Sequence, residues 1–247
     1  MIFSKPYAIR EALEQTVAHH AWLKEHAGPL RIPSIVTVHS DQIDFVLVEG
    51  RHALVADAPA VATDLGCAHA AAWKSDLHRA ILTAAHPLPG GRKLSDFVAP
   101  RIAALRRHRD AGLVSAQQVA DVQSLLAING ATPVAFYKDT NPRNVLITAE
   151  GPVMVDFDSL TLAPFGYDLA KLLVTLAMTH GPLPLEIFTT SLARYNEPLI
   201  AAGLPPVSID QFLAHAELHH LLTLPYLGKG GYRYPWPSVR PLSEDLK

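Results

Sequence analysis

The sequence contains few of the features that mark secreted, membrane-bound or disulfide-stabilised proteins. Cys67 is the only cysteine among 247 residues, so no disulfide can form within the chain, which is typical of proteins in a reducing cytosol. Cys67 lies in an Ala-rich apolar stretch without a basic neighbour, so we expect a buried structural thiol. Lys5 and Pro6 are not followed by the apolar core of a signal peptide. No uncharged apolar run reaches the roughly 18 residues that a membrane-spanning helix needs. We therefore expect a cytoplasmic protein with no secretory signal and no membrane partner.

The chain also lacks an excess of charge of either sign. With 21 basic and 23 acidic residues the formal net charge is −2, so the sequence offers no basic field for a nucleic-acid backbone. The longest basic cluster, Arg-Arg-His-Arg at residues 106–109, is short and typical of a solvated helix face. Hydrophobic residues make up 49% of the chain, enough for the core of one large domain or two small lobes. We expect a globular protein without a nucleic-acid partner.

Apolar spacing predicts a small front part that mixes helix and strand, followed by a larger and mostly helical rear part. Helices are expected at residues 7–27, 59–85, 95–111, 115–128, 167–179, 185–202 and 209–222. Short strands are expected at residues 35–38, 43–48, 134–137, 145–148 and 153–157, the last two separated by the turn Glu150-Gly151-Pro152. The separation of strands from helices along the chain gives the α+β class.

Three oxygen-bearing side chains stand in order within the rear strand block. Asp139 lies in the loop after the first strand, Asn144 just before the second, and Asp156 at the end of the third. Because the second and third strands form a hairpin, we expect Asp156 to return beside Asn144. Phosphoryl transfer needs a carboxylate that orients and deprotonates the acceptor hydroxyl, together with oxygen ligands for Mg²⁺. The three residues therefore predict the metal-and-base half of a phosphotransferase site.

The same block resembles the aminoglycoside phosphotransferase and choline kinase superfamily. Residues 136–147 look like that family's catalytic loop, residues 155–158 like its metal-binding Asp motif, and residues 165–170 like the Asp-Leu-Ala helix start that follows. The resemblance implies a protein-kinase-like two-lobed fold, with a truncated N-terminal lobe and a larger, mainly helical C-terminal lobe. It also implies ATP or GTP as phosphoryl donor, Mg²⁺ as cofactor, and a hydroxyl of a small molecule as acceptor.

The resemblance carries roles onto matching positions. Asp139 would be the catalytic base, Asn144 and Asp156 would hold Mg²⁺, and Asp158 would be a second metal contact or a substrate contact. Asp168 would be structural, because a carboxylate at a helix start can accept backbone N–H groups and brace the catalytic loop.

Two positions of the catalytic loop depart from the family pattern. Tyr137 replaces the usual histidine and Lys138 the usual glycine. Tyr137 can still pack and form a hydrogen bond, so we expect a structural role and an intact loop. Lys138 either faces solvent or contacts a phosphate or the transferred group, and in the second case it belongs with the catalytic residues.

The front of the chain carries fewer of the family's features. Family members place strands and a phosphate-covering glycine loop before the lysine that contacts the phosphates, whereas only three residues separate Met1 from Lys5. Lys5, at the end of a first short strand, is the candidate for that lysine, and Glu14 (or Glu11) is its candidate ion-pair partner. The Gly-Gly pair at residues 90–91 is expected between helices, which is not the setting of a phosphate loop, so we interpret it as an ordinary connection.

The expected hinge divides the chain into two parts. Glu49 and Gly50, after the last front strand, are candidates for contacts with the nucleobase. We expect residues 1–50 to form the reduced, nucleotide-side lobe, and residues 51–247 to form the helical lobe with the catalytic loop and the acceptor site.

The acceptor is expected among small hydroxyl compounds. Residues 181–220 contain four acidic residues and one basic residue, which mildly favours a cationic or amino-bearing acceptor such as an aminoglycoside-like antibiotic, an amino alcohol or a metabolite. His215 and Glu217 on a late helix, and Tyr232 in the irregular tail, are candidates for contacts with the acceptor.

Two other functions stay open at this point. A kinase-like chain without a glycine loop could be a catalytically silent module that binds a nucleotide or another small molecule. His215 and His219, four residues apart on one helix face, could instead hold Zn²⁺ in a metal hydrolase, although no third ligand is evident nearby. Titration with Mg-nucleotide and metal analysis would separate these functions from a kinase.

Overall fold

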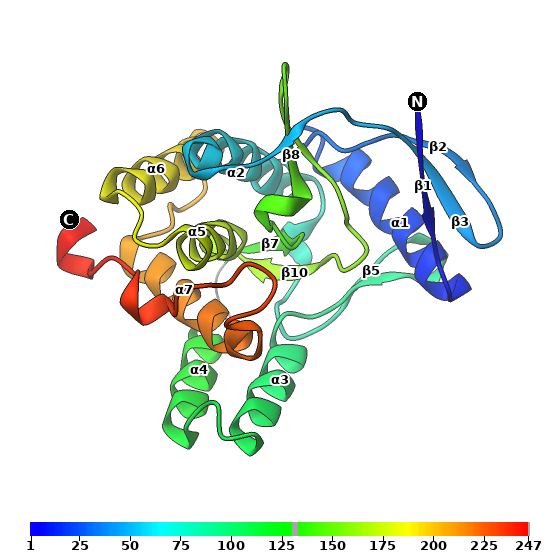
Figure 1. Ribbon diagram of the computed structural model, residues 1–247. Coiled ribbons are helices and arrows are strands. Elements are labelled where there is room, and N and C mark those ends of the chain that lie inside the picture. Colours follow the sequence, from blue (N-terminus) through cyan, green and yellow to red (C-terminus); the bar gives the residue numbers. More distant parts are fainter. Residues whose placement is uncertain (130–132, 247) are drawn as a thin grey trace.

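A small antiparallel sheet and one helix form the end of the molecule that lies at the right of Figure 1. The computed structural model describes residues 1–129 and 133–246. The sheet has the order β1 (Ile2–Pro6), β3 (Gln42–Val46) and β2 (Ile35–Val38), and α1 (Arg10–His26) follows β1. Ile43 and Phe45 alternate with more exposed neighbours along β3, as expected for a strand with one buried face. The register sets Lys5 opposite Ile43 near the end of β1.

Two further small sheets lie between this end and the helices. One contains β4 (Arg51–His52), β8 (Val145–Thr148) and β9 (Gly151–Met154), and the other pairs β7 (Val134–Tyr137) with β10 (Thr161–Pro164). Since β4 follows the connection from β3, the first of these sheets joins the front of the chain to the strand block that carries the predicted chemistry.

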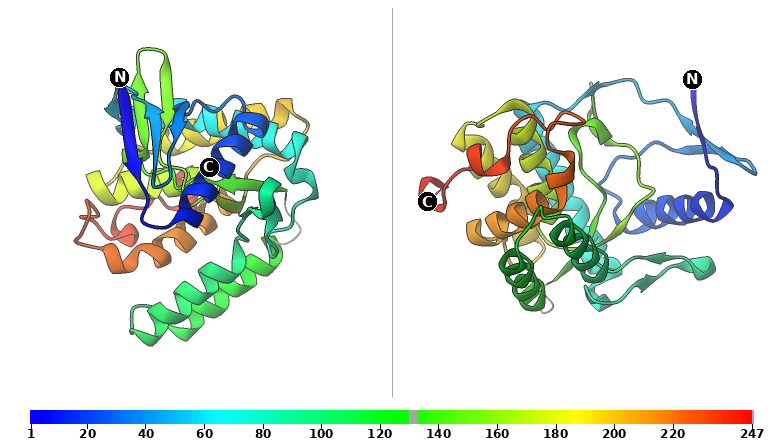
Figure 2. Two further views of the ribbon diagram at one scale, coloured as in Figure 1. Left: turned by 90° about the vertical axis from the view of Figure 1, so that its right-hand side faces the viewer. Right: turned by 60° about the horizontal axis from the view of Figure 1, so that its bottom comes forward.

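Helices make up most of the remaining molecule. They are α2 (Ala58–Ser75), α3 (Val98–Asp110), α4 (Ala116–Asn129), α5 (Tyr167–His180), α6 (Leu185–Ala201) and α7 (Ile209–Thr223). Single 3₁₀ turns lie at Val55–Asp57, Leu77–Arg79, Pro89–Gly91, Pro142–Asn144, Leu224–Tyr226, Trp236–Ser238 and Ser243–Leu246. Helices α3 and α4 project as a hairpin from the rest of the molecule (Figure 2, left). In the described part of the chain, no helix has both the length and the apolar character to cross a bilayer.

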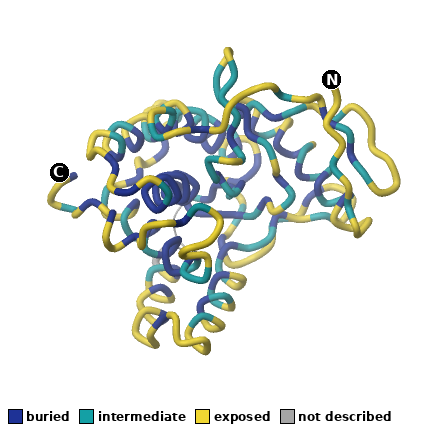
Figure 3. Tube along the Cα trace, in the orientation of Figure 1, coloured by how far each residue is buried: buried dark blue, intermediate teal, exposed yellow. Residues whose placement is uncertain are grey.

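The core is centred on α5, which is dark over most of its length in Figure 3. Twelve of its 14 residues are buried, so α5 is surrounded by protein rather than exposed on one face. Beside α5, helices α2 and α6 pack closely against each other, with Gly66 of α2 facing Tyr195 of α6. A Cβ atom on Gly66 would lie 2.3 Å from the carbonyl oxygen of Tyr195, so only glycine allows this approach. The Tyr195 hydroxyl in turn accepts a bond from the backbone N–H of Gly166 at 2.8 Å, which fixes the start of α5.

The α+β class is confirmed, while several predicted boundaries are wrong. The helix expected at residues 59–85 ends at Ser75, because the Asp76 side chain instead accepts hydrogen bonds from Trp22 and His86 at 2.8 Å each. The chain then forms β5 (His86–Pro87) and β6 (Lys93–Leu94), so the Gly-Gly pair at residues 90–91 joins two short strands rather than two helices. The third rear strand is β9, which ends at Met154, so Asp156 follows the strand instead of ending it.

Candidate active site

Asp139 and Asp156 adopt an unusual backbone conformation. Each has a φ of 63°, and among the residues that the structure describes no other non-glycine residue has a positive φ. This left-handed region is unfavourable for residues with a Cβ atom and persists where surrounding contacts determine the backbone, as at functional sites. The two aspartates that the sequence singles out are therefore the two positions where the chain is held in a strained geometry.

Hydrogen bonds join the loops that carry these aspartates. The Asn144 side-chain Nδ2 donates to the backbone carbonyl of Asp139 at 3.1 Å, a bond that does not use the amide oxygen Oδ1. The backbone N–H of Val155 donates to the carbonyl of Asn144 at 2.9 Å, one residue before Asp156. The β8–β9 hairpin thus returns Asp156 to the neighbourhood of Asn144, as the sequence predicts.

Asp168 braces the catalytic loop from the first turn of α5. Its side chain is fully buried and accepts bonds from the backbone N–H groups of Lys138 at 2.8 Å and Thr140 at 3.0 Å. Burial raises the pKa of this carboxyl, whereas the two N–H donors favour its charged form. Because the bonds fall on either side of Asp139, Asp168 fixes the backbone on both sides of the left-handed residue.

Lys138 lies inside the protein and not in solvent. Only 1% of the residue is exposed. Its Nζ donates to the backbone carbonyls of Val155 at 2.6 Å and Asp156 at 3.1 Å. Burial lowers the pKa of its ammonium to about 8. Of the two alternatives for Lys138, the solvent-facing one is wrong, and the observed contacts tie the loop of Asp139 to the loop after β9.

The Asp139 carboxylate has two donors on a single oxygen. The Tyr137 hydroxyl donates to Oδ1 at 2.8 Å, and the Nζ of Lys171, on α5, lies 3.1 Å from the same atom. Burial and the Asp139 charge raise the pKa of Tyr137 well above its ordinary value, so the hydroxyl stays a neutral donor. Tyr137 thus keeps the hydrogen-bonding role expected of it, whereas Lys171 is a site residue that the sequence reasoning missed.

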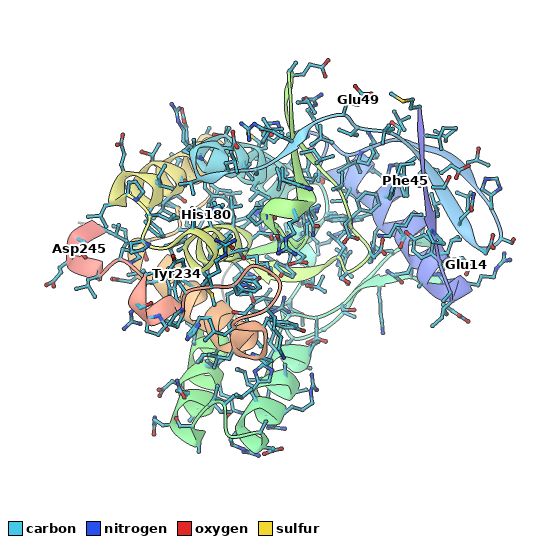
Figure 4. The ribbon with its side chains drawn as sticks, in the orientation of Figure 1. Glu14, Phe45, Glu49, His180, Tyr234 and Asp245 are labelled. Atoms are coloured by element: carbon cyan, nitrogen blue, oxygen red, sulfur yellow. The ribbon has the colours of Figure 1, made fainter. Side chains whose placement is uncertain are left out.

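Lys5 pairs with the loop after β9 and not with α1. Its Nζ lies 2.8 Å from Oδ1 of Asp156 and 2.8 Å from Oδ2 of Asp158. Burial alone would lower the pKa of Lys5, but the two carboxylates outweigh this effect and raise it. The expected pair with Glu14 is wrong. Glu14 lies on the outer side of α1 (Figure 4), where it pairs with Arg10 and Arg92.

Asp158 is held on both of its carboxylate oxygens. Lys5 contacts Oδ2, while Oδ1 accepts bonds from the hydroxyl of Tyr7 at 3.1 Å and that of Thr16 at 3.2 Å. Tyr7 follows β1 and Thr16 lies on α1, so Asp158 connects the front of the chain to the loop after β9.

A cavity of about 360 Å³ opens beside Lys5. Its walls are mainly apolar, with charged groups gathered at one end. The lining residues are Phe3, Lys5, Pro33, Phe45, Val46, Leu47, Val48, His52, Leu146, Val155, Asp156, Phe157 and Asp158. Glu49 and Gly50, the candidates for contacts with the nucleobase, are not among the lining residues, which include Val48 before them and His52 after them. Glu49 lies on the connection from β3 toward α2 (Figure 4). A Cβ atom on Gly50 would lie 2.8 Å from the carbonyl oxygen of Ile147, so this glycine allows the connection to pass close to β8.

The three candidate acceptor contacts are separated in the structure. Tyr232 is brought to the site, with its hydroxyl 3.4 Å from the Nζ of Lys171. His215 is buried against Tyr167, and Glu217 accepts hydrogen bonds from Trp236 and Arg240 in the tail. A smaller cavity, about 140 Å³, lies beside the catalytic loop and is lined by His52, Ala53, Asn141, Pro142, Arg143, Thr175, Thr179, His180 and Gly230. Its lining comes from β4, the loop after β7, α5 and the tail, and includes no residue of α7.

The donor set at the site fits Mg²⁺ better than Zn²⁺. Across residues 1–129 and 133–246, no three His, Cys, Asp or Glu side chains gather as a group that could hold a metal ion, so the zinc hydrolase interpretation has no site. Asn144 and Asp156 offer an amide oxygen and a carboxylate, and the Asp156 side chain is 53% exposed. Mg²⁺ prefers oxygen ligands and is usually bound by one or two carboxylates together with substrate phosphates and water.

The arrangement of Asp139, Asn144 and Asp156, with Lys5 beside a mainly apolar cavity, is the one expected of a kinase-like phosphotransferase. The sequence model of one family matches residues 2–205, and the chain belongs to this phosphotransferase enzyme family. No protein of curated function matches the sequence.

Solved structures with the same fold include kinases of small molecules. Aminoglycoside phosphotransferase APH(3'')-Id of Streptomyces rimosus, in complex with ADP and streptomycin, has a TM-score of 0.57 at 16% identity, covering 90% of this chain and 86% of its own. The ethanolamine kinase of Plasmodium vivax has a TM-score of 0.61 at 15% identity, covering 92% and 69%. The macrolide 2'-phosphotransferase MphH of Brachybacterium faecium has a TM-score of 0.59 at 16% identity, covering 98% and 85%. At these identities the likeness shows the kinase-like fold.

Proposed function

We propose that the protein is a small-molecule kinase that transfers the terminal phosphoryl group of ATP or GTP to a hydroxyl, with Mg²⁺ as cofactor. The observation that carries the proposal is the arrangement of Asp139, Asn144 and Asp156, joined by backbone and side-chain hydrogen bonds beside the cavity at Lys5. Membership of the phosphotransferase enzyme family supports the same reaction.

The nucleotide would bind in the cavity of about 360 Å³, between residues 1–50 and the remainder of the chain. Phe45 and Leu146 would contact the base, and Lys5 would reach the phosphates from the charged end of the cavity. Kinases hold the corresponding lysine by an ion pair with a glutamate on a helix. Here Asp158 takes that position, because it binds Lys5 while Tyr7 and Thr16 hold its other oxygen.

Asn144 and Asp156 would hold the metal ion. When bound, Mg²⁺ supplies positive charge that neutralises the phosphate oxygens. In the structure Lys5 contacts an oxygen of Asp156, so Lys5 would have to release that oxygen for Asp156 to hold the ion. Lys138 keeps the backbone of this loop in place through its bonds to the carbonyls of Val155 and Asp156.

Asp139 would act on the acceptor. Its carboxylate accepts the proton of the acceptor hydroxyl, the hydroxyl oxygen bonds to the terminal phosphorus, and the bond to the bridging oxygen breaks to release nucleoside diphosphate. Asp168 fixes the backbone on both sides of Asp139, so the base is positioned before substrate binds.

The acceptor would be an aminoglycoside-like antibiotic, an amino alcohol or a related metabolite. The small cavity at Asn141 and Thr175 opens beside the catalytic loop and offers polar groups to such a molecule. The similar structures named above include a complex with streptomycin and an ethanolamine kinase. The acidic balance of residues 181–220 carries less weight than the sequence suggests, since Glu197 pairs with Arg194 and Glu217 with Arg240.

Nucleotide consumption tests this proposal. Purified protein is incubated with Mg-ATP or Mg-GTP and a panel of aminoglycosides, amino alcohols and macrolides, and each mixture is assayed for nucleoside diphosphate and for phosphorylated acceptor by mass spectrometry. The wild type is expected to phosphorylate a member of the panel, and Asp139→Asn is expected to lose at least about 100-fold in kcat, the usual contribution of a general base.

The silent-module hypothesis makes the opposite prediction. Binding without transfer would raise the unfolding temperature with Mg-nucleotide while wild type and Asp139→Asn show equal, background consumption. The kinase proposal fails in that case.

A further inference from the structure

Lys171 is a charged residue in the most buried helix of the protein. It lies on α5, and its side chain is only 7% exposed. A buried ammonium is costly unless a partner of opposite charge compensates for the water it has lost. We therefore expect the buried ammonium of Lys171 to have a specific acidic partner.

That partner is the base of the proposed reaction. The Nζ of Lys171 lies 3.1 Å from Oδ1 of Asp139 and 3.4 Å from the hydroxyl of Tyr232. Burial would lower the pKa of Lys171, but Asp139 and Tyr232 together outweigh burial and raise it, so the side chain stays charged. His219 of α7 stays neutral, because burial and the charges of Lys171 and Arg101 lower its pKa well below the ordinary value, so it adds no second cation beside Lys171.

The contacts divide the two oxygens of Asp139 between different tasks. Oδ1 is bound by both Lys171 and the hydroxyl of Tyr137, while the side chain as a whole is 42% exposed. A carboxylate fixed through one oxygen has its second oxygen at a set place and direction. In Asp139 that second oxygen is Oδ2, which accepts no hydrogen bond from the residues that the structure describes.

Helix α5 holds the catalytic loop at two levels. Asp168 and Lys171 are three residues apart, so they lie on one face of the helix. Asp168 binds backbone N–H groups on either side of Asp139, and Lys171 binds its side chain. Backbone bracing alone leaves the Asp139 side chain free to rotate, and Lys171 removes that freedom.

We propose that Lys171 is a positioning residue, which together with Tyr137 holds Oδ1 of Asp139 and thereby presents Oδ2 to the acceptor hydroxyl. This inference rests on the proposed kinase function. In the reaction, Oδ2 takes the hydroxyl proton while Oδ1 keeps its two donors, and the hydroxyl oxygen bonds to the terminal phosphorus as nucleoside diphosphate leaves.

Kinetics of four variants test the role. Lys171→Met keeps the length of the side chain and removes its charge. Its kcat is expected to fall about 100-fold, with KM for Mg-ATP or Mg-GTP within about twofold of wild type, because misplacing a base slows chemistry without changing nucleotide contacts. The matched control Lys74→Met, at an exposed position of α2, is expected to keep wild-type kcat and KM. In an Asp139→Asn background, Lys171→Met is expected to change kcat less than about twofold, because Lys171 acts only through Asp139.

A second measurement does not depend on turnover. The pKa of the Lys171 ammonium is followed by ¹⁵N NMR of lysine side chains in wild type and Asp139→Asn. Since Asp139 raises this pKa against the effect of burial, the pKa is expected to fall in Asp139→Asn.

The outcomes separate the two claims. Loss of activity in Asp139→Asn with full activity in Lys171→Met overturns the positioning role and leaves the kinase proposal intact. Wild-type activity in Asp139→Asn overturns the kinase proposal itself. A Lys171 pKa that is the same in wild type and Asp139→Asn shows that the pair does not form, and overturns the inference whatever the activity.

Discussion

Replacement of Asp168 by alanine is expected to destabilise the whole protein, not only the site. The side chain is fully buried and accepts two backbone hydrogen bonds, at 2.8 Å from Lys138 and 3.0 Å from Thr140. A hydrogen bond to a charged acceptor contributes about 1.5–3 kcal/mol net, so the pair contributes roughly 3–6 kcal/mol. The substitution also removes the cost of burying a charged carboxylate, which offsets part of this contribution. We therefore expect the free energy of unfolding to fall by about 3–5 kcal/mol. That is a large part of the roughly 5–15 kcal/mol by which domains are stable.

Urea denaturation followed by circular dichroism measures this loss. At a slope of about 3 kcal/mol per molar urea, the midpoint for Asp168→Ala is expected to fall by roughly 1–1.7 M with the slope unchanged. Asp210 is a matched control, because it also lies in the first turn of a helix but is exposed. Asp210→Ala is expected to cost under about 1 kcal/mol. The reasoning is refuted if Asp168→Ala loses no more than Asp210→Ala.

Two further predictions concern nucleotide binding and acid stability. Asp158→Asn is expected to weaken Mg-nucleotide binding about tenfold in calorimetric titration, because Lys5 loses the one of its two carboxylate partners that would hold it beside the phosphates. Glu14→Gln is expected to stay within about twofold, and equal effects would contradict the assignment. Burial lowers the pKa of His69 to about 3 and that of His215 to about 4, against 6.5 in the unfolded chain, so stability present above pH 6.5 is lost as the pH falls. Between pH 7 and pH 5, each histidine is expected to lower the free energy of unfolding by about 2 kcal/mol, because its imidazole takes up a proton only in the unfolded chain. A free energy of unfolding that stays constant over that range would be incompatible with two buried neutral imidazoles.

The rear strand block was predictable because its signals are local. Asp139, Asn144 and Asp156 stand at loop and strand ends that turn residues and short apolar runs define. The hairpin that returns Asp156 toward Asn144 follows from the same pattern. The left-handed backbone of both aspartates could not be predicted, since it depends on contacts from distant residues, from Asp168 on either side of Asp139 and from Lys138 to the carbonyl of Asp156.

The ion pair of Lys5 shows why the front was predicted poorly. Sequence spacing favours Glu14, on the helix that directly follows Lys5. The observed partners, Asp156 and Asp158, lie 151 residues or more further along the chain. Arg92 pairs with Glu14 instead, from a strand pair that was predicted to be a connection between two helices. Contacts between such distant segments leave no periodic signal in the sequence.

Lysines in the site were misjudged for a different reason. Lys138 was expected either in solvent or against a phosphate, because charged residues are rarely buried, yet two backbone carbonyls accept its hydrogen bonds. Lys171 was overlooked, although a single basic residue in the apolar run Leu169–Leu176 is a signal that could have identified it. A lone charge within an otherwise apolar helix requires a buried partner, and in a kinase-like chain the catalytic loop offers an acidic one.

The most direct test of the proposed function compares wild type with Asp139→Asn at equal folded concentration. Both proteins are supplied with Mg-ATP or Mg-GTP and the acceptor panel, and phosphorylated product is quantified by mass spectrometry. The kinase proposal predicts that wild type phosphorylates a hydroxyl of at least one acceptor and that Asp139→Asn, with nucleotide affinity retained, loses at least about 100-fold in kcat. Equal rates of product formation by the two proteins would contradict it.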